Sequence, residues 1–249
     1  MAIWNEMECE YTVTPEVSDF NENNLLKPHA YQILIGRAAE EHLNRVGLNV
    51  DTIMPLGYAW ALVSLSVEIK KQLRCPQPLL VHTWHAGRKG PYFRRELEFK
   101  DQAGETVFVA ATFSVLFDLG ERAVYHKKEL PFLLGEPTEK ILLEASPAGR
   151  KAFRNLEYQV VEERVSRPSY LDCLGHVNNC RYGEFAYDAL RPDQYEKLEN
   201  LKRMDVYFIS ELRRADRFTV LRADMEQAAV IRGVRTEKEE TAFEIKFDF

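Results

Sequence analysis

The sequence has no long uninterrupted apolar run and no excess of basic charge. Its longest apolar stretch, residues 54–69, is interrupted by two serines and Glu68, so no membrane span is predicted. The 249 residues carry a formal net charge of −6, whereas proteins that bind nucleic acid present a basic field to the phosphates. We therefore predict a globular chain of one or two domains without a nucleic-acid partner.

Cysteine, glycine and proline are also scarce. The four cysteines, at positions 9, 75, 173 and 180, form no CxxC pair and match no zinc spacing, so we predict neither a metal nor another cofactor. The 12 glycines and 11 prolines are too few for a collagen-like or low-complexity chain. The N-terminal residues lack the basic segment and apolar core of a secretory signal, and a cytoplasmic protein with reduced thiols is expected.

Alternating apolar and charged residues predict that β-strands dominate the chain. The clearest case is 241–249, where four apolar residues from Phe243 to Phe249 alternate with Glu, Lys and Asp. This period of two is typical of a strand with one buried face. The same reading predicts further strands at 7–14, 57–69, 78–86, 92–100, 105–118, 156–165, 204–212, 218–225 and 228–235.

Two segments have apolar residues at helical spacing, 29–46 and about 178–190. Each follows one predicted strand and precedes four more, so the chain reads as strand, helix and four strands, twice. We predict an α+β protein in which each unit is an antiparallel sheet wrapped around its helix. The units are 1–133 and 156–249. Residues 134–155 are rich in Pro, Gly and charge and are predicted to be the linker.

The densest polar cluster, SYLDCLGHVNNCRYGEF, spans 169–185 and contains Asp172 and His176. The next residues, Val177, Asn178 and Asn179, coincide with the predicted start of the second helix. An Asn at this place caps the helix, and the free N–H groups there suit a developing oxyanion. The alternative is a capped helix with a hydrogen-bonded His that has no chemical role.

This string resembles the second domain of the acyl-acyl carrier protein (acyl-ACP) thioesterases of plants and bacteria, which carries D-x-N-x-H-V-N-N-x-x-Y. The segments 59–69, 82–97 and 205–218 resemble that family as well, in the same order. The resemblance implies a tandem double hotdog fold with the catalytic motif in the C-terminal unit. It also implies hydrolysis of fatty acyl-ACP to free fatty acid and carrier protein, the step that terminates fatty acid synthesis.

Carried over by position, the family's catalytic residues fall on Asp172, His176 and Glu211. Two positions depart from the family pattern: its Asn is Leu174 here, and its Cys after the Glu is Leu212, which leaves water as the nucleophile. Glu211, directly or through His176, would take the proton from water, and Asp172 would orient His176 or the water. As a base, Glu211 would need partial burial. The alternative is a surface Glu paired with a neighbouring arginine.

Acyl carrier proteins are acidic, so docking of the acyl-phosphopantetheine carrier needs a local basic patch. We predict Lys70, Lys71 and Arg74 for this patch, with Arg213, Arg214 and Arg217 as the alternative. We expect a monomer or a homodimer. Two other functions stay open, an acyl-CoA thioesterase of the same fold and a catalytically weak acyl-binding protein.

Three further expectations concern the first unit. Its helix is the more apolar one, so the acyl tunnel is predicted there. Arg95 shares a strand face with Phe93 and Leu97, which suggests either a buried ion pair or a site residue. His29 stands before the first predicted helix as His176 stands before the second, and it is interpreted as a relic or a structural cap, because position 25, four residues earlier, is Leu and not Asp.

Overall fold

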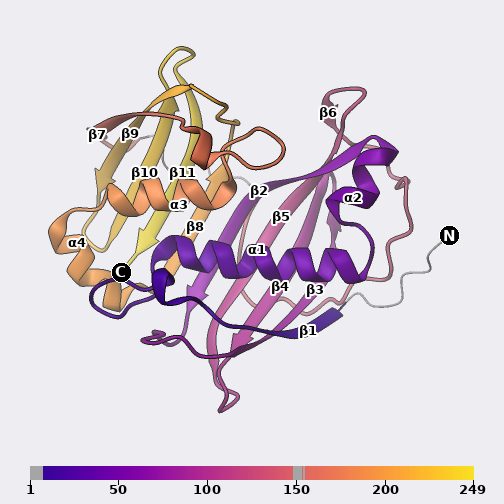
Figure 1. Cartoon of the computed structure of the whole chain (residues 1–249), viewed down its shortest axis with the longest axis horizontal. Coiled ribbons are helices and arrows are strands. Elements are labelled where there is room, and N and C mark those ends of the chain that lie inside the picture. Colours follow the sequence, from indigo (N-terminus) through magenta and orange to yellow (C-terminus); the bar gives the residue numbers. More distant parts are fainter. Residues whose placement is uncertain (1–7, 148–152, 154) are drawn as a thin grey trace.

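The computed structural model describes residues 8–147, 153 and 155–249. Met7 of the first predicted strand and residues 148–152 and 154 of the predicted linker lie outside this part. A single antiparallel sheet forms the back of the molecule, and the two long helices lie on one face of it (Figure 1). These helices are α1 (Pro28–Arg45) and α3 (Asn179–Asp188), close to the predicted ranges.

The 11-stranded sheet runs in the order β1-β3-β4-β5-β2-β8-β11-β10-β9-β7, with β6 paired to β5. The first unit contributes β1 (Glu8–Val13), β2 (Tyr58–Ile69), β3 (Leu79–Lys89), β4 (Tyr92–Lys100), β5 (Thr106–Asp118) and β6 (Ala123–Val124). The second contributes β7 (Gln159–Val165), β8 (Arg203–Phe208), β9 (Arg217–Asp224), β10 (Ala228–Arg235) and β11 (Glu240–Asp248). Short helices α2 (Val50–Ile53) and α4 (Pro192–Glu196) complete the fold.

The tandem double hotdog is therefore confirmed, with each sheet packed against its own helix and the two sheets side by side. The join is the antiparallel pair of β2 and β8, in which Leu65 faces Val206. Across the same pair the Ser66 hydroxyl donates to Asp205 Oδ1 at 2.5 Å, a buried contact between the two units. One continuous sheet results, so residues of both units can contribute to one site.

The predicted strand 204–212 is too long. β8 ends at Phe208, because the N–H groups of Ile209 and Ser210 both donate to the carbonyl of Ala242, at 2.8 and 3.1 Å. Two residues facing one partner interrupt the ladder. Glu211 consequently stands in a loop beyond the strand.

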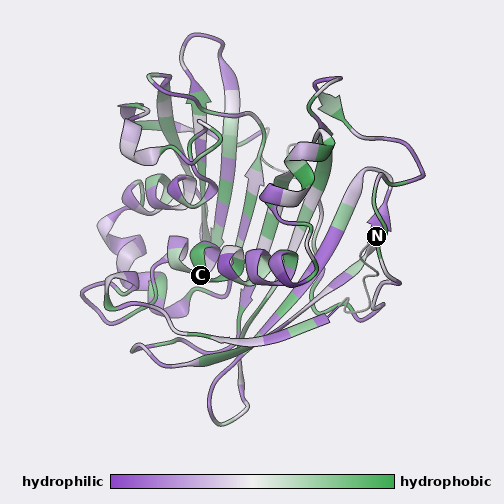
Figure 2. Cartoon of the chain, turned by 45° about the vertical axis from the view of Figure 1, so that its right-hand side comes forward, coloured by the Kyte–Doolittle hydropathy of each residue, from purple (hydrophilic) through white to green (hydrophobic). Residues whose placement is uncertain are grey.

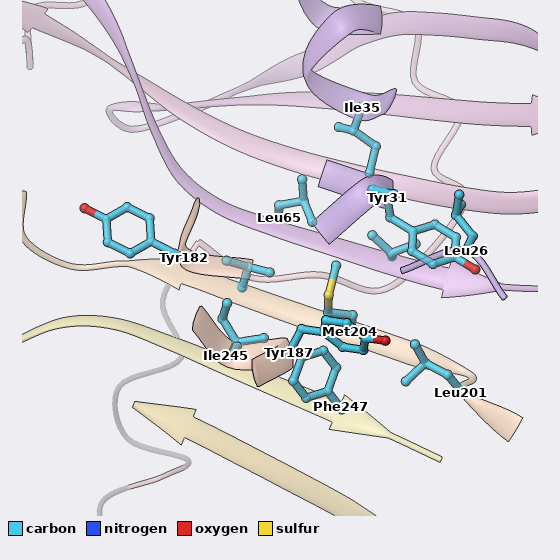
Figure 3. Packing of buried hydrophobic residues seen from close by; sticks show 14 of the residues in the cluster. Leu26, Tyr31, Ile35, Leu65, Tyr182, Tyr187, Leu201, Met204, Ile245 and Phe247 are labelled. Atoms are coloured by element: carbon cyan, nitrogen blue, oxygen red, sulfur yellow. The ribbon is translucent and has the colours of Figure 1, made fainter. Parts of the chain in front are cut away.

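The core confirms the period-two pattern of the last strand, since Phe243, Ile245 and Phe247 are fully buried. Along some strands hydrophobic and hydrophilic residues alternate (Figure 2). Tyr31 of α1 and Tyr182 of α3 belong to one apolar cluster with residues of both sheet halves, such as Leu65, Met204 and Ile245 (Figure 3). The two units thus share a single main core.

Residues 134–147 of the predicted linker form no helix or strand, but they lie against the sheet. The Trp84 indole N–H donates to the Lys140 carbonyl at 2.8 Å, and Arg203 Nη2 donates to the Glu144 carbonyl at 2.8 Å. The segment therefore contacts both units. Within the described residues, no helix is long and apolar enough to cross a membrane.

Candidate functional site

The motif before α3 folds into a tight loop that Asp172 organises. The Asp172 N–H donates to the His176 carbonyl at 2.9 Å, and its Oδ1 accepts the N–H groups of Leu174 and His176 at 2.9 and 3.4 Å. Gly175 adopts φ +77°, a left-handed conformation that glycine tolerates best. The Asp172 carboxylate thus binds backbone groups of its own loop, and no hydrogen bond joins it to the His176 ring among the described residues.

The first unit has the same loop 151 positions earlier. Asn21 Oδ1 accepts the N–H groups two and four residues later, at 3.0 and 2.9 Å, and the Asn21 N–H donates to the Leu25 carbonyl at 2.9 Å. Asn24 repeats the left-handed turn with φ +56°. The residue equivalent to His176 is therefore Leu25. The interpretation of His29 as its counterpart is wrong, because His29 lies inside α1 at the position of Cys180.

His176 and Glu211 are brought together. His176 Nε2 lies 3.1 Å from Glu211 Oε2. The loop carrying Glu211 is fixed by two bonds to the motif: the Val177 N–H donates to the Leu212 carbonyl at 2.8 Å, and the Leu212 N–H donates to the Tyr182 hydroxyl at 3.2 Å. Val177 and Tyr182, both in the motif, thus set the position of Glu211 relative to His176.

The Glu211 side chain is exposed, at 58%, and the His176 side chain is partly buried, at 28%. The partial burial expected for Glu211 as a base is absent. Its Oε2 also accepts a bond from Arg213 Nη2 at 3.2 Å, so the predicted alternative of a surface pair with arginine exists alongside the His176 contact.

Helix α3 begins with Asn178 as its cap, whose Oδ1 accepts the Cys180 N–H at 3.0 Å. The Val177 and Asn178 N–H groups already donate to the carbonyls of Leu212 and Tyr170, so they are not available to an oxyanion. Asn179, the first helical residue, has an N–H without an intrahelical acceptor. It is the remaining backbone donor at the start of α3.

A pocket of about 940 Å³ opens beside this helix start and continues into the first unit. Asn178, Asn179 and Cys180 line it on the α3 side, and its other walls come mainly from α1, β2, β4 and β5. A cavity of this size suits an acyl chain. Leu174 is 40% exposed and does not line the pocket, so the departure from the family Asn alters no wall of the cavity.

Gln32, which no sequence pattern singles out, lines the same pocket from α1. The residue is only 3% exposed, and both its amide oxygen and its amide nitrogen have no hydrogen-bond partner in the described part of the chain. It packs against α3 at Gly183, where a Cβ atom would lie 1.8 Å from Gln32 Oε1. Position 32 lies on the buried side of α1, as the helical pattern allows. Only its unpaired amide therefore distinguishes Gln32 as a candidate site residue.

The predicted docking residues Lys70, Lys71 and Arg74 do not line this pocket, and each of them lies beside a carboxylate. Lys70 pairs with Glu68, Lys71 pairs with Asp101 at 2.8 Å and Glu105 at 2.6 Å, and Arg74 lies 3.8 Å from Glu199. These three cations face four carboxylates, which removes any net positive field.

Their location is also distant from His176. The Ile69 N–H, next to Lys70, donates to the carbonyl of Lys202, the residue before β8. Glu211, in contrast, follows the other end of that strand. The length of β8, roughly 20 Å for six residues, separates the two places. By contrast, Arg213, Arg214 and Arg217 are exposed and directly follow Glu211.

No group of three His, Cys, Asp or Glu side chains suited to a metal occurs in residues 8–147, 153 and 155–249. None of the four cysteines, all in the described part of the chain, forms a disulfide; Cys173 is exposed near His176 and Cys180 is partly buried. Burial raises the pKa of Cys180 to about 11, so this thiol is not a ready nucleophile.

Two family profiles match the two units of the chain. The family profile described as the acyl-ACP thioesterase N-terminal domain matches residues 5–129, and the profile of the acyl-ACP thioesterase C-terminal domain matches residues 154–248. No curated protein matches the sequence closely enough to report.

Two solved structures show the same fold over nearly the whole chain. An acyl-ACP thioesterase from Bacteroides thetaiotaomicron is 18% identical, with a TM-score of 0.78 and 98% of each chain covered. The 12:0-ACP thioesterase from Umbellularia californica is 14% identical, with a TM-score of 0.75, and the match covers 98% of this chain and 97% of that one.

Proposed function

Because the chain belongs to the acyl-ACP thioesterase family, it is a thioester hydrolase that acts on fatty acyl-ACP, and we propose that His176 and Glu211 activate the attacking water. The observation that carries this proposal is the 3.1 Å contact between His176 Nε2 and Glu211 Oε2, next to a helix start that lines a large pocket. The alternatives of an acyl-CoA thioesterase and an acyl-binding protein are not favoured.

In this mechanism His176 is the base. The Glu211 carboxylate accepts a hydrogen bond from the Nε2–H group of His176. This bond fixes the imidazole tautomer in which Nδ1 carries no proton and can take one from water. The exposed Glu211 carboxylate is then a positioning group, which needs no burial. Water oxygen bonds to the thioester carbonyl carbon as its proton moves to His176. The C–S bond breaks in the next step, and the same proton passes to the phosphopantetheine sulfur.

The negative charge on the carbonyl oxygen needs donors in the tetrahedral intermediate. We assign this role to the Asn179 N–H at the start of α3 and to the Gln32 amide from the opposite helix. An unpaired buried amide in the pocket supports the second assignment, because a polar group without a partner is costly unless a ligand supplies one. Asp172 shapes the loop that presents His176, as Asn21 shapes the equivalent loop.

We further propose that the carrier protein docks at Arg213, Arg214 and Arg217. Neither Arg214 nor Arg217 forms an ion pair with a carboxylate among the described residues, so their charges are available to an acidic partner. Their place directly after Glu211 puts the carrier beside the reacting thioester.

Hydrolysis of matched acyl-ACP and acyl-CoA substrates over a range of chain lengths tests this function. We expect acyl-ACP to be the better substrate, with turnover abolished or strongly reduced in His176→Ala. Equal kcat/KM for both carriers would instead support the acyl-CoA thioesterase. Tight binding of acyl thioesters without turnover would support the acyl-binding protein.

A further inference from the structure

Polar side chains form a row across the inner face of the first unit, inside the pocket. His85, Arg95 and Thr112 are direct cross-strand neighbours on β3, β4 and β5, and all three line the cavity. Ser114, two residues further along β5, and His42 of α1 line it too. A wall that only contacts an alkyl chain gains nothing from such groups, because burying them costs free energy unless they find partners.

Arg95 is the charged member of this row. Its Nη1 hydrogen-bonds His42 Nδ1 and approaches the Thr83 hydroxyl at 3.3 Å, and no carboxylate lies within ion-pair distance in the part of the chain that the structure describes. The ion pair considered from the sequence is therefore not formed there. Burial lowers the pKa of Arg95 to about 10, which still leaves the guanidinium charged at neutral pH.

The neighbours do not neutralise this charge. Burial, together with the Arg95 charge, lowers the pKa of His85 to about 4, so His85 is neutral. The groups of β1 that act on Arg95 are the Cys9 thiol and the Tyr11 hydroxyl, which carry no charge in their protonated forms. An anion that entered the pocket would find a desolvated cation with hydroxyl donors at Thr112 and Ser114 beside it.

The position of Arg95 along the pocket matters as well. Polar residues, among them Asn179, Arg181 and Glu184, line the pocket at α3. Between them and β4 the lining includes the apolar side chains of Phe208 of β8 and of Leu62 and Leu65 of β2. Arg95 lies on β4, three strands from β8, a distance of about 14 Å at about 4.8 Å per strand. An acyl chain entering from His176 thus crosses an apolar stretch before it reaches the polar row.

We propose that this pocket accepts acyl chains that end in a carboxylate, the monothioesters of dicarboxylic acids, and that Arg95 binds the distal carboxylate. The inference rests on the proposed function, since it names the acyl group that the thioesterase releases. A hydroxyl or methyl end would leave the guanidinium without a counter-charge, whereas a carboxylate can take both a guanidinium bond and a hydroxyl bond.

The test compares three series of acyl-ACP substrates of equal length: the monothioester of a dicarboxylic acid, its distal methyl ester and the plain acyl chain. We expect wild-type kcat/KM to favour the distal carboxylate at least about tenfold over the methyl ester at one or more lengths. Arg95→Met should remove this preference while the plain chain is still hydrolysed. Arg88→Met is the matched control on β3, because Arg88 bonds to backbone carbonyls outside the pocket and should leave the preference unchanged.

The wild-type comparison decides the inference even if Arg95→Met does not fold. A preference for the plain chain at every length would overturn it. Calorimetric binding of ketone analogues, in which CH₂ replaces the thioester sulfur, separates it from the proposed function. If no thioester is hydrolysed but the carboxylate analogue binds more tightly than its methyl ester, the function fails and the recognition by Arg95 stands. If the carboxylate analogue binds no more tightly than its methyl ester at any chain length, Arg95 does not recognise a distal carboxylate and the inference is wrong.

Discussion

Asn21 and Asp172 hold the same position in two loops of matching conformation, one before each long helix. Each side-chain Oδ1 accepts the N–H groups two and four residues later. The first loop ends in Leu25 and has no acid–base group, yet it keeps the same hydrogen bonds. The shared role of these two side chains is thus to shape the loop, and in the second unit this loop presents His176.

The first prediction follows for Asp172. Asp172→Asn should keep the loop bonds and lose less kcat than Asp172→Ala, since an amide oxygen performs this role at Asn21. The Ala variant should also lower the free energy of unfolding by about 1 kcal/mol, as for other lost side-chain caps. Steady-state hydrolysis and urea unfolding of both variants check this. Equal losses of kcat in Asn and Ala would show that the negative charge itself takes part in the reaction.

The second prediction concerns Gln32. Gln32→Met removes an unpaired buried amide with little change in volume, so the free energy of unfolding should rise by about 1–2 kcal/mol. The same change should lower kcat by about 10²-fold if the amide stabilises the oxyanion. Gln72→Met is the control, because the Gln72 amide donates to the Leu201 carbonyl at 3.0 Å. That variant should lose stability and keep kcat. Unchanged kcat in Gln32→Met would remove Gln32 from the mechanism.

The third prediction places the carrier. Charge reversal at Arg214 and Arg217 should raise KM for acyl-ACP and leave KM for a small thioester such as an N-acetylcysteamine ester unchanged. Reversal at Lys70 and Lys71, which already face carboxylates, serves as the control and should change neither value. If only the lysine reversals raise KM for acyl-ACP, the carrier docks beside Lys70 and Lys71, near the start of β8, and the proposed docking surface is wrong.

The fourth prediction uses His85. Burial lowers its folded-state pKa from 6.5 to about 4, so the unfolded chain binds this proton first as the pH falls. Stability should therefore be unaffected by His85 above pH 6.5 and should decrease between about 6.5 and 4, by about 3 kcal/mol in total. Urea unfolding across this range should show a smaller decrease for His85→Gln than for the wild type. The exposed His126→Gln is the control, and equal pH dependence in all three proteins would contradict the burial of a neutral His85.

Local patterns predict much of this fold. The alternation before Phe249 locates β11 to within one residue at each end, and the helical spacing after Pro28 locates α1 equally well. Both signals come from residues that face one core. The end of β8 is not visible in this way, because the shared acceptor Ala242 is supplied by another strand.

The candidate site likewise contains residues that local sequence patterns predict and residues that they do not. His176, Glu211 and the capping Asn178 are found through a short local motif and a resemblance to a family. Gln32 lacks such a signal, because it lies within a regular helix and is distinguished only by the hydrogen-bond partners it does not have. Arg95 is marked by its place on an apolar strand face, but the absence of a carboxylate partner, which decides between the two roles suggested for it, is not visible in the sequence. Those absences depend on side chains brought together from distant segments, which a single sequence does not specify.

The contact between His176 and Glu211 is the centre of this account, and single-turnover hydrolysis of one acyl-ACP measures it most directly. The rate should fall about 10²–10⁴-fold in His176→Ala and less in Glu211→Gln, which keeps the shape but loses the charge that holds the imidazole. With the enzyme in saturating excess, so that weaker docking of the carrier does not limit the rate, Arg213→Gln, which removes the other partner of Glu211, should stay near the wild-type rate. A well-folded His176→Ala enzyme that hydrolyses acyl-ACP at the wild-type rate would contradict the account.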